Sequence, residues 1–334
     1  MFLLHTSVGQ APLLAAAVVS ACRLSGGWAD PLQPRLLRVL FSQLLGWQGD
    51  LEAQPAITPE AVALALPLPA QRRELIELMV ALEMVCRPIP PPLQASVQHW
   101  AAVLQVDGRS LRLARDLVGH SQALATADFY RLCWIGDGER DDPRLPERLR
   151  HYGLRAFALT VEADAVVSER WRALARCPEG SLGSAMARFY AERGFRLPGE
   201  VGGGNEALAQ HDWVHVVAGY DTTPIGELEV TAFMAAASRS PGAMVGFLGA
   251  VSIYETGLLR SVVVGPDYAH TLASPGGPER VAGAIARGRR CRVDPLLEVA
   301  YFALAAEPLV QIRRDWGLLD DTGASGLASG GQPS

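Results

Sequence analysis

The chain has 334 residues, of which 49% are hydrophobic and 19% charged, and its formal net charge is −5. This length is sufficient for two domains, each with a buried core. The acidic balance excludes a general nucleic-acid binder, which needs a basic surface. The five cysteines form no Cys-x-x-Cys pair, a pattern typical of reduced thiols, so we expect a cytoplasmic protein.

The first 135 residues predict an all-helical domain with an internal repeat. The apolar run Ala11 to Ala21 is too short to cross a bilayer before Arg23, and we expect it to be a core helix. In each repeat a helix ends, a turn rich in proline or glycine follows, and an amphipathic helix begins. The repeat consists of Cys22-Arg23, Pro31-Leu32-Gln33 and a run to Leu45, then Cys86-Arg87, Pro92-Leu93-Gln94 and a run to Leu104.

This two-fold pattern resembles the TerB-like helical domain of tellurite-resistance proteins. The resemblance implies turns whose acidic residues can hold a metal ion. Here the first turn keeps one acid, Asp30, and the second, residues 88–92, keeps none. We therefore expect residues 1–135 to act as a scaffold or a docking site for protein partners.

A charged, proline-punctuated stretch at residues 136–150 predicts a linker to a second domain, residues 151–319. In that domain we expect a helix from about Ala156 to Arg176, and another that Ser181 caps and Gly194 ends. A loop at residues 196–204 leads to the next helix. Residues 320–334 cannot bury enough apolar surface to fold and are predicted to be a disordered tail.

The stretch from His211 to Glu227 is rich in metal-binding side chains. Asn205 and Gly219 are typical caps of a helix over about residues 206–218, and they would place His211, Asp212 and His215 on one face. Thr222 or Thr223 can cap a second helix, with Pro224 at its first position and Glu227 in its first or second turn. A short turn makes these two helices antiparallel neighbours, so Glu227 can reach His215.

Two imidazoles and two carboxylates around one point suit a divalent metal ion. We predict that His211, Asp212, His215 and Glu227 bind such an ion, with zinc as the expected metal. Asp212 is too short to be the general base of a His-Glu-x-x-His metalloprotease. The alternative interpretation is that the histidines are hydrogen-bonded core residues and that the acids cap helix ends.

The order His-Asp-x-x-His, eleven residues, then Glu resembles the signature of the fourth coenzyme Q (ubiquinone) biosynthesis protein family. Shorter pieces are similar to that family over about residues 150–320. They are Pro178-Glu179-Gly180-Ser181-Leu182-Gly183, Gly219-Tyr220, Gly226-Glu227-Leu228, Ala232-Phe233, Gly288-Arg289, Pro308-Leu309 and Ile312-Arg313.

The resemblance implies that the ligand is a polyprenylated quinone precursor or another isoprenoid lipid. It implies decarboxylation coupled to hydroxylation at C1 of a benzenoid ring, with the metal ion on the carboxylate and an adjacent hydroxyl. Tyr220 and Asp221 would relay protons at the mouth of the site. The resemblance also implies other biosynthetic proteins as partners, at the inner face of a membrane to which this protein is peripheral.

Two further patterns lie after Glu227. Gly242, Gly246 and Gly249 leave room near the backbone for a neighbouring helix or for a prenyl tail. A basic cluster ends a helix that starts near Pro278, and either complements the helix dipole or binds an anionic membrane surface. Its members are Arg287, Arg289, Arg290 and Arg292.

Taken together, the sequence predicts an all-α protein of two helical domains, the second with a metal site between two antiparallel helices. Two alternative functions stay open. One is a non-catalytic lipid carrier or scaffold. The other is a helical His-Asp phosphohydrolase, which needs a further histidine and aspartate as ligands. The candidates for those ligands are His151, His270, Asp267 and Asp294.

Overall fold

A computed structural model of the protein describes residues 5–118, 125–127, 129–130, 144–261, 263 and 269–319. Across these ranges the regular structure is helical, and the other backbone pairings are three isolated β-bridges. The predicted all-α fold is therefore confirmed. None of the helices in these ranges is both long and apolar enough to cross a membrane.

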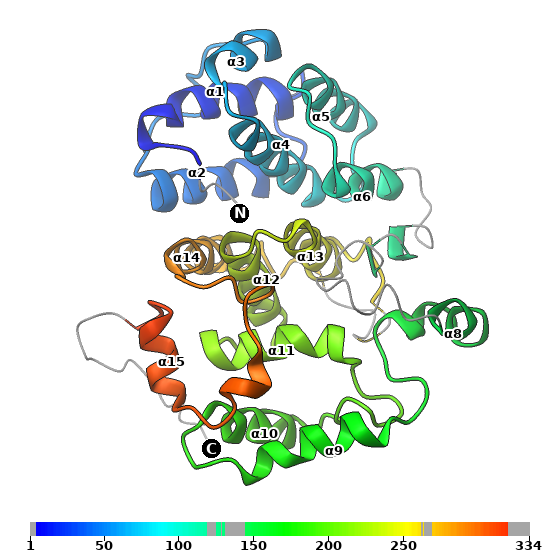
Figure 1. Cartoon of the computed structure of the whole chain (residues 1–334). Helices are drawn as coiled ribbons and strands as arrows, with labels where there is room; N and C mark the ends of the chain where they lie inside the picture. The colour runs from blue at the N-terminus through cyan, green and yellow to red at the C-terminus, as the bar shows by residue number, and fades with distance from the viewer. Residues whose placement is uncertain are drawn as a thin grey trace, which may run out of the picture.

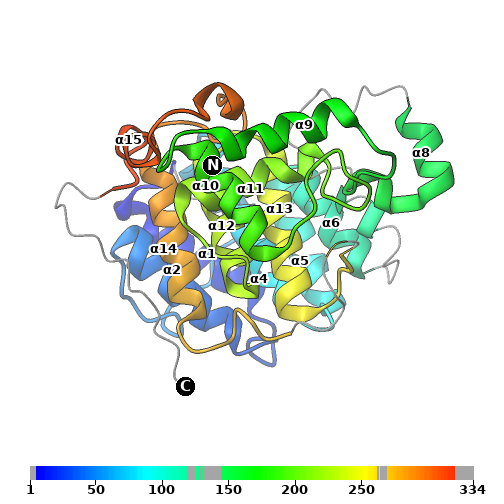
Figure 2. The same cartoon turned by 90° about the horizontal axis from the view of Figure 1, so that it is seen from below.

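The helices stack in layers (Figure 1). Helices α1 to α6 lie at the top, α12 to α14 in the middle, and α9 to α11 with α15 at the bottom. Figure 2, seen from below, has α9 to α11 in front of the N-terminal helices. The middle layer therefore contacts both the N-terminal helices and the helix that carries the two histidines.

The top layer contains the predicted repeat. Helices α1, α2 and α5 begin and end within a few residues of the predicted positions, and α4 ends within a few residues of its predicted end. Proline is favoured at the start of a helix, and Gly46 ends α2 in a left-handed conformation. The bounds in this half are η1 Val8–Gln10, α1 Ala11–Cys22, α2 Leu32–Leu45, α3 Pro59–Ala65, α4 Pro69–Met84, α5 Pro91–Val103 and α6 Arg109–Val118.

The second half contains the remaining helices. Residues 145–150, which the sequence assigns to the linker, form most of α8. The bounds are α8 Leu145–Tyr152, η2 Gly153–Phe157, α9 Ala165–Ala173, η3 Leu174–Arg176, α10 Leu182–Arg193, α11 Glu206–Ala218, α12 Pro224–Ala237, α13 Pro241–Val251, a π-helical turn η4 Ser252–Thr256, α14 Gly277–Arg290, η5 Tyr301–Leu304 and α15 Leu309–Asp315.

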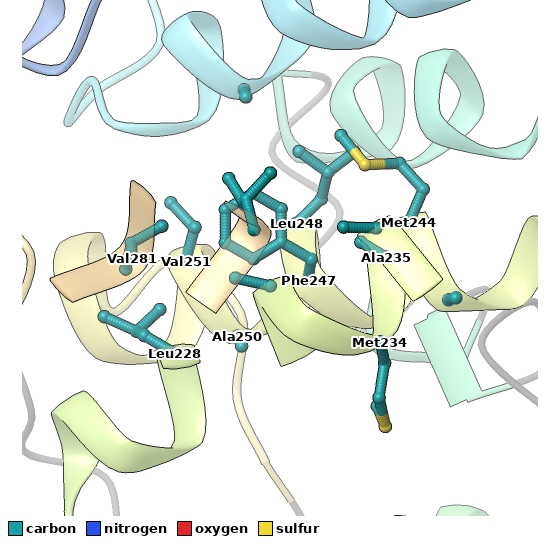
Figure 3. Close-up of a cluster of buried hydrophobic side chains, with 14 of the residues drawn as sticks. Leu228, Met234, Ala235, Met244, Phe247, Leu248, Ala250, Val251 and Val281 are labelled. Atoms are coloured by element: carbon teal, nitrogen blue, oxygen red, sulfur yellow. The ribbon is translucent and has the colours of Figure 1, made fainter. Parts of the chain in front are cut away.

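One large apolar cluster joins the two halves, since α2 packs on α14, and α4 and α6 pack on α13. In Figure 3, Met244, Phe247 and Leu248 lie on the side of α13 that faces the N-terminal helices, and Met234 points the opposite way. Close packing of α12 and α14 depends on Gly288, where an added Cβ would lie 2.4 Å from the Phe233 carbonyl oxygen.

The division into domains at residues 136–150 stays a prediction, and the predicted tail at 320–334 lies outside the described residues.

The predicted helix from about Ala156 to Arg176 is wrong before Ala165, where the structure has the end of η2 and then non-helical backbone. Helix α9 begins only at Ala165, because the Asp164 carboxylate accepts hydrogen bonds from two backbone N–H groups of the first turn and so caps it. Before Asp164, Leu159 forms an isolated bridge with Gly204. The backbone groups of this segment are therefore satisfied by the loop that precedes α11 rather than by a helix.

Candidate metal centre

The turn between α11 and α12 forms as the sequence predicts. The Asn205 side chain accepts a hydrogen bond from the Leu208 N–H at the start of α11, and Gly219 ends the helix at a φ of 78°. Thr223 caps α12, and Glu227 lies in the first turn of that helix. This local chemistry brings Glu227 back towards the histidines of α11.

Two arginines from distant segments secure the end of α11. Arg313 of α15 donates to the carbonyl oxygens of Val216 and Val217, each at 2.9 Å, and Arg287 of α14 donates to that of Ala218 at 3.0 Å. These carbonyls would otherwise lack partners at a helix end. The guanidinium groups therefore fix the helix turn that carries His215.

Three side chains of the predicted metal set converge. One ligand atom from each of His211, His215 and Glu227 can be chosen so that all three lie within 4.8 Å of one another. The Nε2 atom of His211 lies 3.8 Å from Glu227 Oε2, and that of His215 lies 3.3 Å from Glu227 Oε1. The group can hold a metal ion.

Hydrogen bonds to the backbone define the tautomer of both rings. Nδ1 of His211 lies 2.5 Å from the Leu208 carbonyl oxygen, and Nδ1 of His215 lies 3.2 Å from that of Tyr220. A carbonyl oxygen can only accept a hydrogen bond, so each Nδ1 carries the proton. In the neutral rings each Nε2 then presents a lone pair towards Glu227, as in a histidine that binds a metal through Nε2.

Burial makes this arrangement costly without a cation. The His215 side chain is fully buried, and its Nε2 makes no hydrogen bond of acceptable geometry although Glu227 is close. Burial lowers the pKa of His215, but the Glu227 and Asp212 carboxylates and the Tyr220 carbonyl together outweigh it and raise the pKa overall. Burial raises the pKa of Glu227, but His215 and His211 together outweigh it and lower the pKa overall. Either a proton or a metal ion can therefore stabilise the pair.

Asp212, the fourth predicted ligand, does not belong to the group of three. One of its carboxylate oxygens, Oδ1, lies 3.3 Å from His211 Nε2, while Oδ2 accepts a hydrogen bond of 2.5 Å from the Tyr190 hydroxyl. Burial, and after it the Asp212 carboxylate, raises the pKa of Tyr190, so this phenol stays a neutral donor. The role of Asp212 as a ligand stays a prediction.

The two predicted proton relays lie beside the centre. Tyr220 packs its ring on Phe233, with the Arg287 guanidinium 5.2 Å from the ring centroid, and its carbonyl oxygen orients His215. Asp221 accepts hydrogen bonds from the N–H and hydroxyl of Thr223, which holds its carboxylate at the start of α12. Neither side chain lines the cavity described next, and their catalytic roles stay predictions.

A cavity of about 530 Å³ opens beside the three ligands. His211, Asp212 and Glu227 contribute to its wall, and most of the remaining wall is apolar. Met234, which points away from the N-terminal helices in Figure 3, is one of these apolar residues. The others include Phe129, Phe157, Leu159, Leu208 and Ile253.

Two of the three glycines singled out in the sequence lie next to this cavity. Gly249 contacts the Phe129 ring, so close that an added Cβ would overlap it. Gly246 lines the cavity, and an added Cβ would meet nothing within 4 Å. The space beside Gly246 therefore belongs to the cavity and not to a neighbouring helix.

The basic cluster after Pro278 divides into two pairs. Arg287 and Arg289 donate to backbone carbonyls, the latter to Leu44 of α2 at 3.0 Å. Arg290 and Arg292 are exposed. Half of the predicted membrane-binding surface therefore also holds helices together.

Among the described residues, the three candidates for the further ligands of a His-Asp phosphohydrolase do not join the centre. His151 lies on the exposed side of α8, and His270 is an exposed residue near Glu255. Asp294 is buried and accepts hydrogen bonds from the backbone N–H groups of Arg239 and Leu296. Asp267 lies outside the described residues.

Tyr190 and the apolar cavity wall were not predicted as parts of the site. The wall residues come from segments between residues 129 and 263 that no local pattern links. Tyr190 belongs to a helix whose caps are visible in the sequence, but its contact with Asp212 spans 22 residues.

Comparisons with known proteins find only distant similarity to this chain. No family model matches the sequence, and no curated protein matches it. Among solved structures, a putative ubiquinone biosynthesis protein from Nostoc punctiforme PCC 73102 is similar over 73% of this chain and 97% of its own, at 18% identity and a TM-score of 0.32. A TM-score of this size does not establish a common fold, so function has to be inferred from the residues of the site.

Proposed function

We propose that this protein binds a divalent metal ion through His211, His215 and Glu227 and holds an isoprenoid lipid in the adjacent cavity. The observation that carries this proposal is the pair of Nε2 atoms directed at Glu227 on the wall of an apolar cavity. Backbone carbonyls hold the opposite side of each ring, so both lone pairs are free for a cation.

The donor set suits a borderline divalent ion, with zinc as the first candidate. Two neutral imidazoles and one carboxylate contribute a single negative charge. A three-residue set leaves at least one coordination position open to water or to an oxygen of a ligand. A bound ion would polarise that oxygen as a Lewis acid.

The cavity favours a ligand with a polar head and a long apolar part. Its volume lies in the range of small-molecule sites, and its mostly apolar wall includes His211, Asp212 and Glu227 at the metal centre. The head would lie beside His211 and Glu227, and the apolar part along Met234 and Gly246. The sequence resemblance supports a polyprenylated benzenoid quinone precursor, with decarboxylation and hydroxylation at C1 as the proposed reaction. That reaction releases carbon dioxide and needs dioxygen as the oxidant and the source of the hydroxyl oxygen.

We also propose an anionic membrane surface as a partner. It depends on Arg290 and Arg292, which are exposed, since Arg287 and Arg289 are bound to backbone carbonyls. An anionic surface would attract these two cations. Charge reversal at both positions should then reduce binding to vesicles that contain phosphatidylglycerol.

The lipid part of the proposal is tested by filling the cavity. Gly246→Leu places a side chain into the cavity without a clash at Cβ, and Gly283→Leu is a matched control, because Gly283 also lies in a helix and has nothing within 4 Å of an added Cβ. We expect Gly246→Leu to lose binding of a C20 isoprenoid alcohol and to keep its metal, while Gly283→Leu keeps both. Equal lipid binding by the two variants would contradict the proposal.

A second measurement separates an enzyme from a carrier. A prenylated hydroxybenzoate is incubated aerobically with the metal-loaded protein, and the products are analysed by mass spectrometry. Loss of the carboxylate and gain of a hydroxyl would support the reaction at C1. Tight binding without turnover would favour the non-catalytic carrier or scaffold.

A further inference from the structure

The cavity beside the metal centre is built from both halves of the chain. Phe129 and Tyr130, which precede the predicted linker, line it together with residues of the second half. Helix α13 contributes Gly246 and Ala250 to its wall. Another side of α13 packs on α4 and α6, as the position of the N-terminal helices in Figure 3 shows. The N-terminal helices therefore lie behind one wall of the cavity.

The same wall continues into the π-helical turn η4, which follows α13 directly. Ile253 and Tyr254 of this turn line the cavity, and Glu255 comes next in the chain. Single π-helical turns are rare and are found frequently at functional sites. Because two residues of η4 belong to the wall, a displacement of this turn changes the shape of the cavity.

Glu255 ties η4 to residues 270–273. Its side chain is 4% exposed, and its Oε2 atom accepts hydrogen bonds from the backbone N–H groups of Leu272 at 2.6 Å and Ala273 at 3.0 Å. Its backbone carbonyl oxygen accepts another from the His270 N–H at 2.8 Å. Hydrogen bonds to a carboxylate are stronger than those between neutral groups. The position of η4 therefore depends on where residues 270–273 lie.

Arg35 of α2 holds this segment from the N-terminal half. Its guanidinium group donates to the carbonyl oxygens of Ala273 at 2.9 Å and Ser274 at 3.3 Å. The same group lies 3.7 Å from the carboxylate of Glu279, in the first turn of α14. A guanidinium presents several donors in a fixed plane, which suits two neighbouring acceptors. Direct contacts therefore run from α2 through Ala273 and Glu255 to the cavity wall.

We propose that the N-terminal helices are part of the lipid site, with Arg35 and Glu255 as positioning residues that hold the η4 wall in the shape that accepts the lipid. This inference rests on the proposed lipid-binding function and gives the N-terminal half a role in it. When this hold is lost, a smaller fraction of the molecules has the binding-competent wall, and the apparent lipid affinity falls by that fraction.

The metal centre is held by different contacts. The turn between α11 and α12 places its three ligands, and Arg287 and Arg313 bind the carbonyl oxygens at the end of α11. Loss of the Arg35 and Glu255 contacts should therefore change lipid binding and leave metal binding as it is.

The test compares the full-length parent with Arg35→Gln, Glu255→Gln and the double variant. Arg38→Gln is the matched control, because Arg38 is an exposed arginine on the same helix. Each protein is titrated with a fluorescent C20 isoprenoid alcohol, and separately with Zn²⁺ in competition with a coloured chelator. Glutamine keeps the size of Glu255, and Arg35 is 39% exposed, so both single variants should fold, which circular dichroism checks.

We expect Arg35→Gln and Glu255→Gln each to weaken binding of the isoprenoid by roughly fivefold or more, at unchanged Zn²⁺ affinity. Arg38→Gln should bind both ligands as the parent does. The double variant should lose less affinity for the isoprenoid than the product of the two single effects, because both residues act through Ala273.

Three results would overturn the inference in different ways. Unchanged isoprenoid affinity in either single variant would show that the contacts do not shape the cavity. Equal weakening of isoprenoid and Zn²⁺ binding would show that the two residues support the fold as a whole. A parent that binds no isoprenoid would refute the proposed lipid function itself, and with it this inference, whereas in the first two results the parent binds normally.

Discussion

The buried carboxyl of Glu83 offers a test of the core of the N-terminal helices. This side chain of α4 is 1% exposed, and its Oε1 has no hydrogen-bond partner. Burial raises its pKa from 4.5 to about 8. The group therefore stays protonated in the folded protein at a pH where the unfolded chain has already released the proton.

The sign of the effect follows from this raised pKa. Below pH 4.5 both the folded and the unfolded protein keep the proton on Glu83, so ionisation of this carboxyl does not change the free energy of unfolding. Between pH 4.5 and about 8 the folded state binds more protons than the unfolded state, so the free energy of unfolding falls as pH rises. The slope is about 1.4 kcal/mol per pH unit, or roughly 3 kcal/mol between pH 5.5 and 7.5.

The measurement is urea unfolding of the parent and of Glu83→Gln at pH 5.5 and at pH 7.5. The glutamine cannot ionise, so its stability relative to the parent should rise between the two pH values by up to about 3 kcal/mol. Any constant cost of the amide cancels in this comparison. Glu60→Gln is the control, because hydrogen bonding lowers the pKa of that exposed carboxyl and keeps it ionised at both pH values. A Glu83→Gln difference that is the same at both pH values would refute the reasoning.

Three further predictions concern packing, capping and the metal. Gly288→Ala should destabilise the protein by roughly 1–3 kcal/mol in urea unfolding, because the added Cβ meets the Phe233 carbonyl oxygen. Gly283→Ala is the control and should stabilise the protein by about 0.5–1 kcal/mol, because nothing lies within 4 Å of its added Cβ. Equal effects of the two substitutions would contradict the close approach of α12 and α14. Asp164→Ala should cost about 1 kcal/mol in the same assay through loss of the α9 cap, and no loss would argue for an earlier helix start. Removal of metal with a chelator should lower the midpoint of thermal unfolding of the parent but not that of His215→Gln, and an equal shift in both would exclude His215 as a ligand.

Local signals predicted most of the helix that carries the histidines. Asn205, Gly219 and Thr223 act through bonds to residues at most four positions away, so their roles can be recognised in sequence. The same holds for the return of Glu227 towards His215, which needs only a short turn. Prediction was most accurate where the structure depends on neighbours in the chain.

Long-range contacts explain what could not be predicted. The pairing of the segment before Asp164 with the loop before α11 involves the bridge between Leu159 and Gly204, although the Asp164 cap itself is a local signal. The end of α11 is anchored by Arg313 from nearly a hundred residues away. Tyr190 belongs to the same class, because its effect on Asp212 requires α10 to lie beside α11. No periodicity or cap in the sequence specifies those pairings.

The most direct test of the proposed function is elemental analysis of the purified protein together with mass spectrometry of its organic extract. Glu227→Gln is the test variant, and His151→Ala is the control, since that histidine lies on the exposed side of α8. The proposal predicts one equivalent of a divalent metal in the parent and in His151→Ala, its loss in Glu227→Gln, and an isoprenoid lipid in the parent extract. A parent that contains no metal, or equal metal in Glu227→Gln, would contradict the proposal and leave His211, His215 and Glu227 as a partly buried polar network.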